Sequence, residues 1–169
     1  VIWLYAPGFI NPERPIKMDN TYITELTGFR VGRLDETCSP RFRIRDGHPA
    51  LKYGDPFRRY GYIDRDVHSN VWLGSAIAPP FANPCFYIDD PEATILGTYC
   101  EMGVPAYGLK EMDGWTSVYC APQILRSELL ASLAEYAGCH LYNKDDDVLY
   151  SNQNFVTIHA AYKGKHTLY

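Results

Sequence analysis

The residues of this chain that could carry nucleophilic or metal chemistry are its cysteines and histidines. The chain has five cysteines, with no C-x-x-C pair and no spacing typical of a zinc framework: Cys38, Cys85, Cys100, Cys120 and Cys139. No two of the five histidines have the i, i+4 spacing of a helical metal site. We therefore predict free, mostly buried cysteines that act as small hydrophobic residues, and no metal or cofactor. A disulfide between Cys100 and Cys120 across a hairpin is the alternative.

Cys120 comes nearest to a catalytic nucleophile. It ends a predicted strand and a helix follows, but no glycine flanks it and Pro122 comes two residues later. The strained strand-to-helix elbow that presents a nucleophile on an α/β sheet is therefore absent. The pattern favours an inert buried thiol, and no catalytic residue is predicted. A small hydrolase that pairs Cys120 or Cys100 with a loop histidine, His48 or His68, remains an alternative hypothesis.

Carboxylate pairs do not define a site either. Glycoside hydrolysis needs two carboxylates placed across the scissile bond. Glu101 with Glu111, or Asp89 with Asp90, exist as residue types, but nothing in the sequence fixes them across a cleft. The Asp-Asp-Pro run is typical of a turn.

The composition is that of a soluble globular protein. The chain has 169 residues, 46 % hydrophobic and 21 % charged, which suits one domain with a small appendage. Its formal net charge of −4 gives no basic footprint, so we expect no nucleic-acid partner. No apolar run approaches the ~20 residues of a membrane span, so we expect no membrane partner. Both ends lie in strand-like sequence, which favours a piece of a larger polypeptide and leaves the compartment unknown.

The elements that would position these residues follow from the hydrophobic pattern. Residues 1–7 form a continuous apolar run, typical of a strand buried on both faces. A short helix should follow near residues 20–28, capped by Asp19 or Asn20 and ended by Gly28. Strand, loop and helix in this order predict the first half of a βαβ unit.

The next segments show a strand-like alternation of residue types. Residues 29–35 and 41–46 alternate basic and apolar types, which predicts half-exposed strands near a sheet edge. Residues 105–112 and 115–120 predict a hairpin turned at Asp113-Gly114. Residues 123–139 have the apolar spacing of an amphipathic helix.

After that helix the period switches to two, and the tail predicts short antiparallel strands at residues 148–152, 155–160 and 166–169.

A longer succession of motifs points to a family. A P-E-A-x-x-L-G-x-Y strand lies at residues 91–99, a G-x-P-A hairpin start at 103–106, and an L-L-x-x-L-A-x-x-A-G helix at 129–138. In these motifs the chain resembles the middle domain that follows the catalytic barrel in many bacterial β-galactosidases and related glycoside hydrolases. That domain is often called the trimerisation domain and has a class-I glutamine-amidotransferase-like fold.

The resemblance implies a fold and a role. The fold would be α/β, a flavodoxin-like or amidotransferase-like sheet with flanking helices over residues 1–142, with residues 143–169 as part of a small C-terminal β module. In the family the catalytic glutamates lie on the upstream barrel, so this chain would be a non-catalytic accessory and oligomerisation domain. Its expected partners are the upstream glycosidase domain of the same chain and other copies in a homo-oligomer.

The irregular segment 51–70 holds the candidate interface residues, because aromatic and arginine side chains are enriched at interface hot spots. These are Tyr53, Phe57, Arg58, Arg59, Tyr60 and Tyr62. A self-packed surface loop is the competing interpretation. The alternative function is a carbohydrate-binding module, in which Trp72 or Trp115 would stack on sugar rings.

Overall fold

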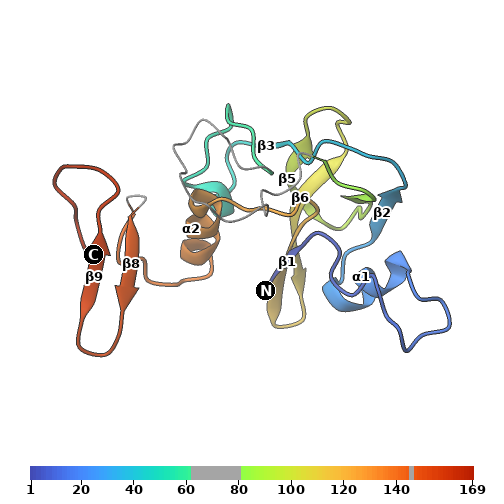
Figure 1. The fold of residues 1–169 in the computed structure, drawn as a ribbon, viewed down its shortest axis with the longest axis horizontal. Helices are drawn as coiled ribbons and strands as arrows, with labels where there is room; N and C mark the ends of the chain where they lie inside the picture. The colour runs from blue at the N-terminus through green and yellow to red at the C-terminus, as the bar shows by residue number, and fades with distance from the viewer. Residues whose placement is uncertain (62–80, 145–146) are drawn as a thin grey trace. The chain divides into compact units, whose positions relative to one another are not determined.

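The computed structural model describes residues 1–61, 81–144 and 147–169 (Figure 1). Its internal contacts divide the chain into two units. Unit 1 comprises residues 1–46 and 55–125, and unit 2 comprises residues 47–54 and 126–169. The predicted domain boundary between residues 142 and 143 stays a prediction.

Unit 1 is built on a five-stranded mixed sheet. In spatial order its strands are β1 (Ile2–Leu4), β7 (Trp115–Cys120), β6 (Pro105–Met112), β5 (Thr94–Tyr99) and β3 (Phe42–Ile44). β1 runs parallel to β7, and every other pair in this sheet is antiparallel. The predicted hairpin is confirmed: Met112 pairs with Trp115 around Asp113 and Gly114, and Gly114 has the positive φ of 78° that the tight turn requires.

A two-stranded sheet and a helix complete the described part of unit 1. β2 (Val31–Leu34) and β4 (Cys85–Ile88) pair antiparallel. The predicted helix is confirmed as α1 (Asn20–Thr27): the Asp19 side chain accepts a hydrogen bond from the Thr21 N–H at 2.7 Å, and Gly28 ends the helix at φ 80°. The helix is joined to the main sheet by Ser117, whose hydroxyl donates to the carbonyl of Thr27 at 2.6 Å.

The predicted flavodoxin-like or amidotransferase-like α/β class is wrong. The two α-helices of the described residues are only eight and ten residues long. The predicted class has a parallel sheet flanked by helices, whereas the main sheet here is mostly antiparallel. The predicted βαβ unit does not form because β2, the strand after α1, pairs with β4 in a separate sheet. Residues 1–7 are not buried on both faces either, since β1 is an edge strand with Ile2 and Leu4 more than two-fifths exposed.

The core of unit 1 is rich in aromatic rings. Phe42 lies between Tyr60 and Tyr107, with centroids 5.7 and 5.8 Å away, and all three side chains are fully buried. The ring of Phe29, which follows α1 in the chain, contacts that of Tyr119, with the two ring centroids 5.7 Å apart. Such ring pairs contribute about 0.5–1.5 kcal/mol each beyond the area that they bury.

The described residues of unit 2 form one short 3-10 helix, one α-helix and one hairpin. Its elements are η1 (Pro49–Leu51), α2 (Ser127–Tyr136), β8 (Val148–Ser151) and β9 (Val156–His159). The α-helix is shorter at both ends than the predicted 123–139. Two of the three predicted tail strands are confirmed, whereas residues 166–169 are not a strand. Tyr53 holds residues 47–54 to α2 by donating its N–H to the Ser132 hydroxyl at 2.9 Å.

Candidate functional site

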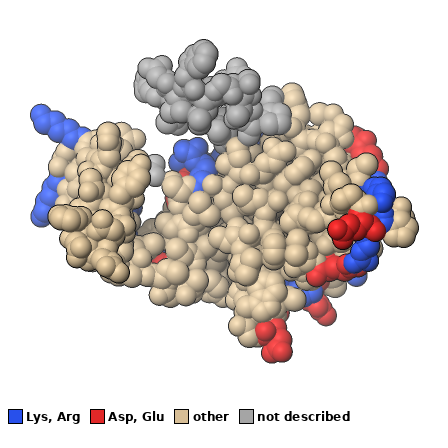
Figure 2. Space-filling model, turned by 60° about the horizontal axis from the view of Figure 1, so that its bottom comes forward, with Lys and Arg blue, Asp and Glu red and all other residues tan. Residues whose placement is uncertain are grey.

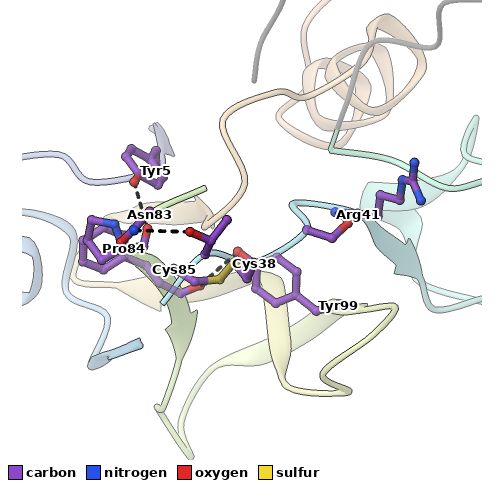
Figure 3. Close-up of a disulfide and its surroundings, with 10 residues drawn as sticks. Tyr5, Cys38, Arg41, Asn83, Pro84, Cys85 and Tyr99 are labelled. Atoms are coloured by element: carbon purple, nitrogen blue, oxygen red, sulfur yellow. Dashed lines mark hydrogen bonds between the residues drawn. A yellow bond between two sulfur atoms is a disulfide. The ribbon is translucent and has the colours of Figure 1, made fainter. Parts of the chain in front are cut away.

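Two of the five cysteines are not free. Cys38 and Cys85 form a disulfide with their Cα atoms 6.0 Å apart, which corrects the prediction that the cysteines are unpaired (Figure 3). Around it the Tyr5 hydroxyl donates to the Pro84 carbonyl at 2.8 Å, and the Tyr99 hydroxyl donates to the Phe86 carbonyl at 2.9 Å. The alternative Cys100–Cys120 bond does not form, because both thiols are free.

Neither free thiol in unit 1 has the properties of a nucleophile. Cys120 is fully buried, and burial raises the pKa of its thiol far above the ordinary value. Cys100 is exposed, but partial desolvation and the neighbouring Glu101 carboxylate raise its pKa. A reactive cysteine needs a lowered pKa and access together.

The described residues of unit 1, which holds both thiols, include no histidine. His48 belongs to unit 2, where Nδ1 accepts a hydrogen bond from the Ala50 N–H at 3.1 Å and so caps η1. His68 lies outside the described residues. In the described ranges no three His, Cys, Asp or Glu side chains are grouped to hold a metal ion.

The described residues among the predicted interface candidates differ in their exposure to solvent. Phe57 is 88 % exposed and Arg59 is exposed, as an interface would require. Tyr60 is instead a core residue with no exposed surface, because its ring contacts Phe42 and its hydroxyl accepts the Asp55 N–H at 2.8 Å. Arg58 and Tyr53 are half-buried, Tyr53 being in unit 2. Tyr62 lies outside the described residues.

Of the two candidate sugar-stacking residues, Trp115 is described and Trp72 lies outside the described residues. Trp115 begins β7 beside the hairpin turn and is 37 % exposed. No second exposed aromatic side chain pairs with it across the strand, because its partner is Met112. The carbohydrate-binding alternative stays a prediction.

One hollow on unit 1 collects basic and polar side chains. Its volume is about 350 Å³, and its lining residues are Arg43, Arg59, Thr98, Tyr99, Cys100 and Gly103. The alternation in residues 41–46 correctly predicted an edge strand, β3. However, no pattern in the sequence indicates that Arg59, which belongs to a separate loop, lines the same hollow as Arg43.

The surroundings of these two arginines differ from those of Arg14 and Arg33 in unit 1. On the face drawn in Figure 2, acidic and basic side chains lie next to one another at the right-hand end. In unit 1, Arg14 forms an ion pair with Glu25 and Arg33 forms one with Asp35, both at 2.8 Å. Within the described ranges, Arg43 and Arg59 form no such ion pair.

No protein family, curated protein or solved structure matches this chain in the three comparisons made. Neither of the described α-helices is long and apolar enough to span a bilayer.

Proposed function

We propose that this chain is a non-catalytic accessory part of a multidomain glycoside hydrolase, and that it acts by assembling with a second copy of itself. The family part of this proposal is supported by the motifs in residues 91–138 that resemble β-galactosidase middle domains. The non-catalytic part is supported by the raised pKa values of Cys100 and Cys120.

The observation that carries the assembly role is the β8–β9 hairpin of unit 2. It is a two-stranded ladder in which Leu149 pairs with Ile158, and each strand has one edge without a strand partner in the described residues. Several of its apolar side chains are exposed: Tyr150 is 68 % exposed and Val148 is 51 % exposed on one face. An isolated two-stranded hairpin is marginally stable in water, and an open edge is a template for pairing with another chain.

Pairing between two such hairpins would cover both the open strand edge and the exposed apolar side chains. A second copy offers the same strand edge and the same apolar side chains, so one symmetric contact covers both hairpins. Tyrosine is a residue type that often dominates the energy of such contacts, which makes Tyr150 the residue to test.

Sedimentation velocity over a range of micromolar concentrations tests the proposal. We expect a concentration-dependent oligomer. We also expect Tyr150→Glu to weaken self-association by at least about 30-fold, the equivalent of a 2 kcal/mol hot spot. The matched control is Ile16→Glu, an apolar residue of unit 1 that is 60 % exposed. A strict monomer, or equal weakening by both variants, would contradict the assembly role.

A second measurement tests the non-catalytic part. The purified chain should leave aryl β-glycosides unhydrolysed at a concentration where it is fully assembled. Hydrolysis that persists through purification and is lost on a point substitution of an acidic residue would show that the chain is itself an enzyme.

A further inference from the structure

We infer that the hollow bounded by Arg43 and Arg59 on unit 1 is a binding site for a small tetrahedral oxyanion, a phosphate or sulfate group. This inference does not depend on the proposed assembly role, because the hollow lies wholly within unit 1 and the assembly hairpin belongs to unit 2.

The backbone places the polar side chains on one side of the sheet edge. Arg43 lies directly opposite Thr98 in the β3–β5 ladder, and Cys100 follows two residues later. The main chain there is held by the Cys100 N–H, which donates to the Arg41 carbonyl at 2.9 Å. Because side chains alternate along a strand, the burial of Phe42 and Ile44 directs Arg43 outward.

The second guanidinium comes from a different segment. Arg59 precedes the core residue Tyr60, whose N–H donates to the Phe42 carbonyl at 2.8 Å and whose carbonyl accepts the Phe42 N–H at 3.0 Å. This bridge fixes the segment beside β3, so Arg59 reaches the hollow from an anchored backbone. Two guanidinium groups from two fixed segments are well suited to an oxyanion, because each presents planar N–H donors.

The electrostatics of the hollow are consistent with an anion. Desolvation and the Glu101 carboxylate raise the pKa of the Cys100 thiol, and the positive charges of Arg43, Arg59 and Arg41 act in the opposite direction, so all three guanidinium groups influence this thiol. Glu101 is the acidic residue that opposes them there. Since the whole chain carries a formal charge of −4, this concentration of positive charge is local.

The size and access of the hollow favour a small ligand. Its volume of about 350 Å³ is near the lower end of ligand sites in proteins. Gly103 is at the rim, and a Cβ built on it would meet no atom within 4 Å, so the rim is open on that side. The Thr98 hydroxyl adds a neutral donor beside the two guanidinium groups.

The first test is an NMR titration of the full chain with inorganic phosphate and with sulfate, at ionic strength held constant by sodium chloride. We expect saturable shifts at the amides of Thr98, Cys100 and Gly103. Arg43→Gln and Arg59→Gln should each weaken binding at least tenfold, whereas Arg14→Gln, which removes an exposed arginine paired with Glu25, should not. Thermal unfolding of each variant checks that the fold is kept.

The outcomes separate the possibilities. Shifts that chloride alone reproduces, or equal weakening by Arg43→Gln and Arg14→Gln, would overturn the site. Acetate that binds as tightly as phosphate would overturn the tetrahedral class. Arg43→Lys keeps the charge but loses the planar donors, so binding weaker than wild type supports guanidinium recognition, and unchanged binding overturns it.

A second experiment tests the position of the bound anion by the reactivity of Cys100. Phosphate in the hollow should slow the alkylation of Cys100 by iodoacetamide, followed by mass spectrometry of tryptic peptides. Cys139, an exposed free thiol of unit 2, is the internal control and should react at the same rate with and without phosphate. Equal rates for Cys100 in both conditions at saturating phosphate would contradict binding at this position.

Discussion

Cys38 and Cys85 form a disulfide that ties the segment before β3 to the first residue of β4, across a sequence separation of 47 residues. The bond lies where distant segments meet: Cys38 and Ala82 exchange two main-chain hydrogen bonds of 2.9 and 2.8 Å. The Tyr5 hydroxyl at the end of β1 binds the Pro84 carbonyl beside it (Figure 3). Both sulfur-bearing residues are buried, so the bond is part of the core of unit 1.

Replacing both cysteines should therefore destabilise unit 1. Loss of a cross-link that closes a loop of this length frees the unfolded chain, and we expect Cys38→Ala with Cys85→Ala to lower the free energy of unfolding by about 4 kcal/mol. Urea unfolding followed by tryptophan fluorescence measures the change. Cys139→Ala is the control and should leave the midpoint unaltered. An unchanged midpoint in the double variant would show that the bond contributes nothing to stability.

Asp90 should make unit 1 sensitive to acid. Its carboxylate is 5 % exposed and accepts hydrogen bonds from Lys110 Nζ at 2.9 Å and from the N–H groups of Arg30 and Glu92. Partial burial raises the pKa of Asp90. The three hydrogen bonds together lower it by more than burial raises it, so the net pKa lies below its usual value. A lowered folded pKa gives stability that is present above the unfolded value, near 3.9, and is lost as the pH falls through the folded one.

Asp90→Asn tests this sign. At pH 7 the free energy of unfolding of the variant should be lower by about 1.5–3 kcal/mol, the range for hydrogen bonds to a charged group. Between pH 5 and pH 2 its stability should fall less steeply than that of the wild type. Asp89→Asn is the matched control, since the neighbouring carboxylate is 62 % exposed. Identical pH slopes for wild type and Asp90→Asn would contradict the assigned role.

A side chain at Gly61 should destabilise unit 1. Gly61 has φ 90°, and a Cβ built there would lie 2.0 Å from the carbonyl oxygen of Pro40. Gly61→Ala should cost about 1–2 kcal/mol for the left-handed backbone and a further ~1–3 kcal/mol for the overlap, because a backbone atom has to move. Gly114→Ala also has positive φ but meets no atom within 4 Å, so it should cost the first amount alone. Urea unfolding of the two variants measures the difference, and equal costs would disprove the close approach to Pro40.

Local sequence signals predicted local structure well. The Asp19 cap, the Gly28 terminus and the Asp113-Gly114 turn all lie where side-chain and glycine preferences placed them, because each depends on a few adjacent residues. The edge position of β3 was also recognisable from its alternating arginines.

Pairing between distant segments was not predictable in this way. The period of a strand does not say which strand it will pair with, so the parallel pairing of β1 with β7 and the antiparallel pairing of β2 with β4 were not recognised. The same limit applies to Cys38 with Cys85 and to Arg43 with Arg59, which meet only through the fold. For Tyr60 the prediction was wrong in another way: the aromatic and arginine residues around it in the sequence indicated an interface, whereas its ring lies in the core.

Asp147 should control the order of the chain after β9. Its side chain is 1 % exposed and accepts hydrogen bonds from the Ala161 N–H at 2.8 Å, from Asn143 Nδ2 at 3.2 Å and from His166 Nδ1 at 2.6 Å. The Ala161 hydrogen bond is the largest cause that lowers the pKa of Asp147, desolvation opposes it, and His166 lowers it further. The other ring nitrogen of His166 faces the Tyr162 carbonyl at 2.8 Å, so both ring nitrogens donate when the imidazole is charged.

Amide hydrogen exchange followed by NMR tests this arrangement. The lowered pKa means that the carboxylate protects the Ala161 amide above the unfolded pKa and that protection is lost as the pH falls through the folded value. Asp147→Asn should reduce the protection of Ala161 at pH 5, and in the wild type acid should have the same effect. The Phe155 amide is the control, because it donates to Asn152 Oδ1, which does not titrate. If acid reduces the protection of Phe155 and Ala161 equally after correction for intrinsic exchange, the loss is a general opening of the hairpin and Asp147 has no specific role.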